Sequence, residues 1–138
     1  MRQIKFRGKR KDTGEWVYGD LQLGDGDHIP MIGEVVCGHD PYYVQVEEDT
    51  IGQFTGLYDK NGSPIYEGDI VKTPLLDPIF GDILSDAFDN APIEFSNGSF
   101  VVSYYNGNHK IYIQDLYDKI EVIGNIHDNP DSDFRLFQ

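Results

Sequence analysis

The segment Gly52–Lys72 limits the possible folds of this chain more than any other, because it has the pattern of two strands joined by a tight turn. Asn61-Gly62 can supply the positive φ that a short hairpin turn requires. The second strand, 64–72, is rich in β-branched residues, as half-buried strands are. Two more Asn-Gly pairs follow at 97–98 and 106–107. Turns at this spacing predict a small meander barrel of antiparallel strands.

Further strands are expected where apolar and polar residues alternate. The predicted strands are 2–7, 15–21, 28–36, 42–46, 54–58, 64–72, 92–95, 99–105, 109–114 and 120–126. Short helical turns are expected at 49–50 and 115–119. Glu67-Gly68-Asp69 predicts a bend, because glycine admits backbone geometry that a Cβ forbids.

The segment Leu75–Asn90 has a different period and predicts an amphipathic helix near 77–89. Asp77 can cap the helix, and Pro78 suits its first position. The apolar stripe consists of Ile79, Phe80, Ile83, Leu84, Ala87 and Phe88. Gly81 weakens such a helix by about 1 kcal/mol relative to alanine. The stripe can pack on the barrel, which we favour, or fill a partner's groove.

The cysteine content and the hydropathy pattern predict an intracellular, reducing location. The single Cys37 excludes an internal disulfide framework and a cysteine-based zinc knuckle. No apolar run approaches the roughly 20 residues that span a bilayer. The amino terminus is basic but lacks the apolar stretch of a signal peptide.

Charge is unevenly distributed along the chain, whose formal net charge is −13. Six of the eleven basic residues precede the first acid, and these are Arg2, Lys5, Arg7, Lys9, Arg10 and Lys11. The rest of the chain holds five basic and all 24 acidic residues, so most of its surface repels phosphate. The basic segment could therefore contact nucleic acid locally, pair with an acidic face of its own or of a neighbouring subunit, or stay solvated.

Several blocks of this sequence occur together in one order. The first blocks are Ile4-Lys5-Phe6-Arg7-Gly8-Lys9 and Trp16-Val17-Tyr18-Gly19-Asp20. The central ones are 52–62 and 65–71, and the last are 122–127 with Asn129-Pro130. In these blocks the chain resembles the YopX family of phage and prophage proteins from end to end, whereas 22–49 match loosely and 75–90 look like an insertion.

The resemblance implies an SH3-like barrel at 51–138, preceded by a smaller, irregular subdomain at 1–50 that contains a β-hairpin. The expected fold is thus mainly β, with one inserted amphipathic helix. The resemblance also implies a phage or prophage origin and a location in the bacterial cytoplasm. It implies no activity, because the family has no assigned catalytic residues to carry over.

The sequence offers no constellation typical of a metal site or of an enzyme. The four histidines lack the spacing of zinc ligands, so we expect no metal and no cofactor. Glu67 and Asp69 could share a face, but a turn whose carboxylates accept backbone N–H bonds is the favoured interpretation. Trp16 is expected to anchor the core or a hairpin rather than stack on a ligand.

Binding is the favoured class of function. Tyrosine is enriched at protein interfaces, and the candidate side chains here are Tyr104, Tyr105 and Tyr112. The leading hypothesis is a non-enzymatic phage or prophage accessory protein that binds another macromolecule, most simply a protein. The alternatives are nucleic-acid binding through the basic segment and a structural homo-oligomer, and no membrane role is expected.

Overall fold

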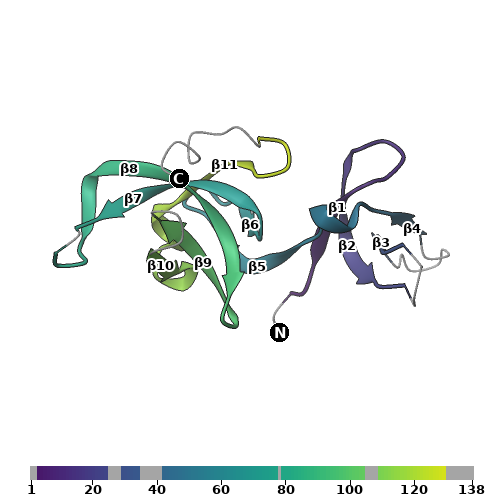
Figure 1. Cartoon of the computed structure of the whole chain (residues 1–138), viewed down its shortest axis with the longest axis horizontal. Coiled ribbons are helices and arrows are strands. Elements are labelled where there is room, and N and C mark those ends of the chain that lie inside the picture. Colours follow the sequence, from purple (N-terminus) through teal and green to yellow (C-terminus); the bar gives the residue numbers. More distant parts are fainter. Residues whose placement is uncertain (1–2, 25–28, 35–41, 78, 105–108, 130–138) are drawn as a thin grey trace. The chain divides into compact units, whose positions relative to one another are not determined.

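In a computed structural model, the chain is described at residues 3–24, 29–34, 42–77, 79–104 and 109–129. It divides into two compact units, Met1–Gly56 and Leu57–Gln138. The strands form two antiparallel sheets, so the predicted mainly β class is confirmed (Figure 1).

The first sheet has six strands in the order β4-β3-β2-β1-β5-β6. Their bounds are Phe6–Lys9 (β1), Trp16–Gln22 (β2), Met31–Glu34 (β3), Tyr42–Gln45 (β4), Gly52–Tyr58 (β5) and Pro64–Tyr66 (β6). A 3₁₀ turn, η1 (Glu48–Thr50), precedes β5. The strands predicted from alternation are found here, although β1 begins four residues later than expected.

The second sheet has five strands in the order β10-β9-β8-β7-β11. Their bounds are Asp69–Leu76 (β7), Ile83–Ser96 (β8), Ser99–Tyr104 (β9), His109–Tyr112 (β10) and Glu121–Asn125 (β11). Two 3₁₀ turns, η3 (Ile113–Asp115) and η4 (Tyr117–Lys119), join β10 to β11.

The four-stranded part of the first unit curls, so that the end of β1 meets the end of β4. Arg10 forms an isolated antiparallel bridge with Val46. The N–H of Glu47 donates to the carbonyl of Lys9 at 2.8 Å, and the N–H of Lys9 donates to Oγ1 of Thr50 at 2.9 Å. These bonds satisfy backbone groups that an open edge would leave to solvent.

Gly8 permits this curl because a side chain there would crowd the small core of the first unit. A Cβ at Gly8 would lie 3.1 Å from Cδ1 of Ile32 and 3.2 Å from Cβ of Val46. Ile32 and Val46 are fully buried, and Phe54 of β5 is buried as well. The core of this unit is therefore small, and it depends on close strand packing.

The second unit has the larger core, which lies between its sheet and the 3₁₀ turns. Its buried members are Ile65, Val71, Ala91, Ile93, Val102, Ile113, Leu116 and Ile120. Ala91 and Ile93, two residues apart in β8, lie on one face of that strand, beside Val71 of β7 and Val102 of β9. Ile113 and Leu116 close it from the short helical turns.

The glycine turns of the second unit form as the sequence predicts. Gly62 has φ +84° in the turn between β5 and β6. Asn97 and Gly98, at φ +51° and +83°, make the two-residue turn between β8 and β9. The predicted turn at 106–107 lies outside the described residues.

The predicted helix at 77–89 is wrong, because this segment forms the far end of a long β-hairpin. β7 and β8 run antiparallel (Figure 1), with Thr73 opposite Asp89 and Pro74 opposite Phe88. The register shifts between Pro74 and Leu76, which is opposite Ile83. The backbone N–H and C=O groups of β8 thus form hydrogen bonds with β7 instead of with one another in a helix.

Asp77 does what a helix cap does, but the chain then reverses. Its carboxylate accepts the N–H groups of Ile79 and Phe80 at 2.8 and 2.9 Å. Gly81 adopts φ +74°, and the N–H of Asp77 donates to the carbonyl of Asp82 at 2.7 Å. The left-handed conformation of Gly81 ends the helical turn. The cap formed by Asp77 therefore closes a hairpin instead of starting a helix.

The SH3-like barrel is not supported either. The described strands of residues 51–129 contribute to two antiparallel sheets, and these sheets do not close into a barrel. Among the described residues, β7 pairs with β8 and β11, and β10 ends the strand order of the second sheet. The 14-residue β8 accounts for this, because it pairs with β7 along its first part and with β9 along its last.

Candidate functional site

The basic residues near the amino terminus lie in a strand of the first sheet. β1 pairs with β2 on one side and β5 on the other. Arg7, only 6% exposed, stacks over the Trp16 ring with its guanidinium carbon 4.7 Å from the ring centroid. Nζ of Lys9 lies 5.4 Å from the same centroid, and Nζ of Lys5 lies 5.4 Å from that of Phe54. These charges therefore pack on aromatic rings within the unit.

Arg10 and Lys11 have acidic neighbours. Arg10 donates two hydrogen bonds to the Asp12 carboxylate, both at 2.9 Å, and Nζ of Lys11 lies 4.0 Å from Oε2 of Glu47. The hydrogen bond to Asp12 raises the pKa of Arg10, and Tyr42 contributes in smaller part. The same hydrogen bond lowers the pKa of Asp12.

The basic set is thus part of a folded sheet rather than a detached arm. Arg2 lies outside the described residues. The binding of nucleic acid, or of a neighbour's acidic face, by this set stays a prediction.

The predicted tyrosines belong to the second unit. Tyr104 ends β9, opposite His109, whereas the exposed Tyr112 ends β10, opposite Val101. The two tyrosines thus lie at opposite ends of one strand pair. Tyr105 lies outside the described residues.

The first unit contains an open pocket that sequence reasoning missed, here called the aromatic pocket. Its lining residues come from β2, β3 and β4 and are Trp16, Val17, Tyr18, Ile32, Gly33, Glu34, Tyr42 and Val44. Its volume is about 410 Å³, within the range of ligand pockets.

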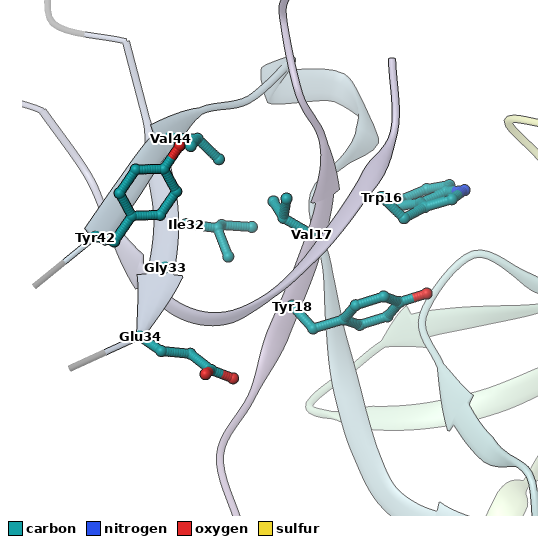
Figure 2. A pocket seen from close by; sticks show the side chains of 8 residues that line it. All are labelled: Trp16, Val17, Tyr18, Ile32, Gly33, Glu34, Tyr42 and Val44. Atoms are coloured by element: carbon teal, nitrogen blue, oxygen red, sulfur yellow. The ribbon is translucent and has the colours of Figure 1, made fainter. Parts of the chain in front are cut away.

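The strand period explains how the pocket is lined. Figure 2 shows Val17 and Ile32 pointing toward each other, with Tyr42 and Val44 of β4 beside them. Trp16 and Tyr18 point to the opposite side of β2 from Val17. Apolar side chains of β2, β3 and β4 thus lie together with Tyr42, whereas the Trp16 and Tyr18 side chains lie on the other side of β2.

Two glycines hold the strands of the pocket close together. A Cβ at Gly33 would overlap the carbonyl oxygen of Tyr42, and one at Gly19 would overlap the carbonyl oxygen of Gly33. Gly19 also adopts φ +151°. The shape of the pocket therefore depends on the absence of side chains at both positions.

The pocket lining includes one charged side chain. Glu34 is the only carboxylate among the lining residues, and it follows Ile32 on the same face of β3. Arg10, whose pKa Tyr42 helps to raise, is itself hydrogen-bonded to Asp12. Tyr42 itself is 67% exposed.

The bend at Glu67-Gly68-Asp69 is structural, as the sequence predicts. Gly68 has φ +91°, and the buried Asp69 accepts the N–H of Tyr66 at 2.7 Å. Among the described residues, no three His, Cys, Asp or Glu side chains are grouped so that they could hold a metal ion. None of the described helices is long and apolar enough to cross a membrane.

The residues that line the pocket belong to strand patterns in separate parts of the sequence. Trp16-Val17-Tyr18 alternates as a strand does, and Tyr42 precedes a Val-x-Val pattern. Nothing local indicates that these strands, which are far apart in the sequence, lie next to each other. The contribution of three strands to one pocket follows only from the register of β2, β3 and β4.

Comparison with known proteins gives one solved structure of similar fold. The chain is similar over its whole length to protein EF1440 from Enterococcus faecalis, whose crystal structure matches with a TM-score of 0.56 at 22% identity and 100% coverage of both chains. At this identity, the likeness shows the fold alone. No curated protein matches the chain.

The family model of the YopX protein matches residues 5–132. The chain therefore belongs to the YopX family, as its sequence blocks predict.

Proposed function

We propose that this chain is a non-enzymatic accessory protein of a phage or prophage, which acts in the bacterial cytoplasm by binding another protein. The observation that carries the proposal is the aromatic pocket. Its open apolar lining, with the half-buried Val17 and Val44, suits an apolar side chain presented by a protein loop or strand.

The position of the pocket in the sheet supports a protein partner. β4 ends the strand order of the first sheet, and Tyr42 on this strand is largely exposed. Proteins commonly bind extended segments along such terminal strands, with pockets that select side chains. Tyrosine and tryptophan are also the residues that contribute most to such interfaces.

Charge favours a protein over a nucleic acid at this pocket. The chain carries a formal charge of −13, and Glu34 lines the pocket. Both disfavour the close approach of phosphates. Membership in the YopX family supports the phage or prophage origin.

Site-specific photo-crosslinking in bacterial lysate tests this function. A photoreactive phenylalanine analogue replaces Tyr42 in one preparation, Tyr112 in a second and Tyr117 in a third. All three tyrosines are exposed, but only Tyr42 lines the pocket. We expect one specific protein adduct from position 42 and none from position 117. An adduct at position 112 alone would transfer the site to the second unit, and adducts with nucleic acid alone would contradict a protein partner.

A further inference from the structure

The one charged side chain that lines the aromatic pocket, Glu34, lies exposed at the opening of the pocket. It is opposite Tyr42 in the β3–β4 register, just as Ile32 is opposite Val44. A Cβ at Gly19 would lie 3.2 Å from Cγ of Glu34, so the stem of Glu34 extends over bare backbone of β2. Figure 2 shows its carboxylate directed toward that strand. The negative charge therefore lies beside the apolar lining rather than away from it.

No basic side chain of the described residues forms an ion pair with this carboxylate. The ion pairs in this part of the chain do not include Glu34. Arg7 stacks on the Trp16 ring instead. Arg10 donates both of its hydrogen bonds to Asp12. The charge of Glu34 is thus left for a cation that another molecule supplies.

The charge of the first unit also favours a cationic ligand. Residues 1–56 hold ten acidic residues and six basic ones, and the whole chain has a formal charge of −13. A field of this sign attracts a positively charged partner and repels a negatively charged one. The long-range field and the charge at the pocket therefore select the same kind of ligand.

The ligand must also cover the apolar part of the lining. Val17 and Val44 are half-buried, and the Tyr42 ring is largely exposed. Long cationic side chains bury their aliphatic stems on such surfaces and keep the charged end in water. Of these side chains, arginine fits best, because its planar guanidinium donates two parallel hydrogen bonds to a carboxylate and stacks on aromatic rings.

We propose that the aromatic pocket receives an arginine side chain of the partner protein, with the aliphatic stem against Val17, Val44 and Tyr42. The guanidinium then meets the carboxylate of Glu34. This inference rests on the proposed function, because it names the side chain that the partner inserts. It narrows the apolar side chain expected there to one whose far end carries a positive charge.

An NMR titration with two matched probes tests the inference. The probes are the N-acetyl methylamides of arginine and citrulline, which have nearly the same shape, although only arginine is charged. Glu34→Gln removes the charge at the pocket. Asp20→Asn is the matched control, because Asp20 is exposed in the same unit but lies outside the pocket lining. The amide spectrum of each variant also shows whether it is folded.

We expect the arginine probe to shift the amide signals of Val17, Glu34 and Val44 in the wild type. It should bind about threefold more tightly than the citrulline probe, as a partly exposed ion pair allows. Asp20→Asn should keep this preference. In Glu34→Gln the two probes should bind equally, because the side chain at the opening is no longer charged.

Equal binding of the two probes by the wild type would overturn the inference. So would a preference for arginine that persists in Glu34→Gln, or an absence of shifts in the strands of the pocket. The photo-crosslink at position 42 tests the proposed function separately. A protein adduct that forms to the same extent with and without Glu34→Gln would leave the proposed function standing and exclude arginine as the inserted side chain.

Discussion

At the residue scale, Asp59 shows how one buried carboxylate joins distant segments. One of its oxygens accepts the N–H groups of Asn61 and Ser63, both at 2.9 Å, within the turn after β5. The other accepts the N–H of Val122 in β11 at 2.8 Å. The turn is thus tied to a strand more than 60 residues away in sequence.

Asp59→Ala should lower the free energy of unfolding by about 3 kcal/mol, because it leaves partly buried N–H groups without their charged acceptor. Asp118→Ala is the control, since Asp118 is exposed and pairs only with its neighbour Lys119. The control should change stability by less than about 0.5 kcal/mol. Urea unfolding measures both, and equal effects of the two substitutions would contradict the role of Asp59.

Asp77 gives a pH-dependent prediction at the same scale. The N–H groups of Phe80 and Ile79 lower the pKa of Asp77. Its stabilising effect is therefore complete above the ordinary aspartate pKa of about 3.9 and is lost as pH falls through the lower folded value. NMR titration should show a midpoint below about 3.9 for Asp77, together with weaker protection of the Phe80 N–H, relative to its intrinsic exchange rate, below that midpoint. Asp77→Ala should show the weaker protection already at neutral pH. A midpoint at or above the ordinary value would contradict the turn geometry.

At the element scale, the close packing of β3 against β4 depends on Gly33. Gly33→Ala should destabilise the protein by about 3 kcal/mol, because its Cβ would overlap backbone that cannot rotate away. Gly14→Ala is the control in the same unit, with a positive φ of +75° but open space around it. We expect a cost of about 1 kcal/mol there. Thermal unfolding compares the two, and a similar loss from both would show that β3 and β4 are less closely packed.

At the scale of elements, the sequence could predict strands and turns but not the pairing between strands. Most predicted strands and the Asn-Gly turns at 61–62 and 97–98 were found where alternation and turn chemistry placed them, because both signals act locally. The hairpin end was missed because Asp77 caps a turn and a helix by the same hydrogen bonds. Only pairing with β7 distinguishes the two structures, and pairing is a non-local property.

At the scale of the whole molecule, the two sets of predicted binding residues lie in different units. The basic residues lie in the first unit and the predicted tyrosines in the second. The aromatic pocket could not be predicted, because its lining comes from three strands whose register sequence patterns leave open. The basic segment was visible as a run of charge, but the stacking of Arg7 and Lys9 on Trp16 depends on the β1–β2 register.

The most direct test of recognition by the aromatic pocket compares two variants in affinity capture from bacterial lysate. Tyr42→Asp changes the pocket, and the triple change Lys5→Gln, Lys9→Gln and Lys11→Gln removes positive charge near the amino terminus. If the pocket binds the partner, Tyr42→Asp should reduce capture at least tenfold, while the triple variant retains most of it. Loss of capture in the triple variant alone, with release by salt, would contradict the pocket and assign recognition to the basic residues.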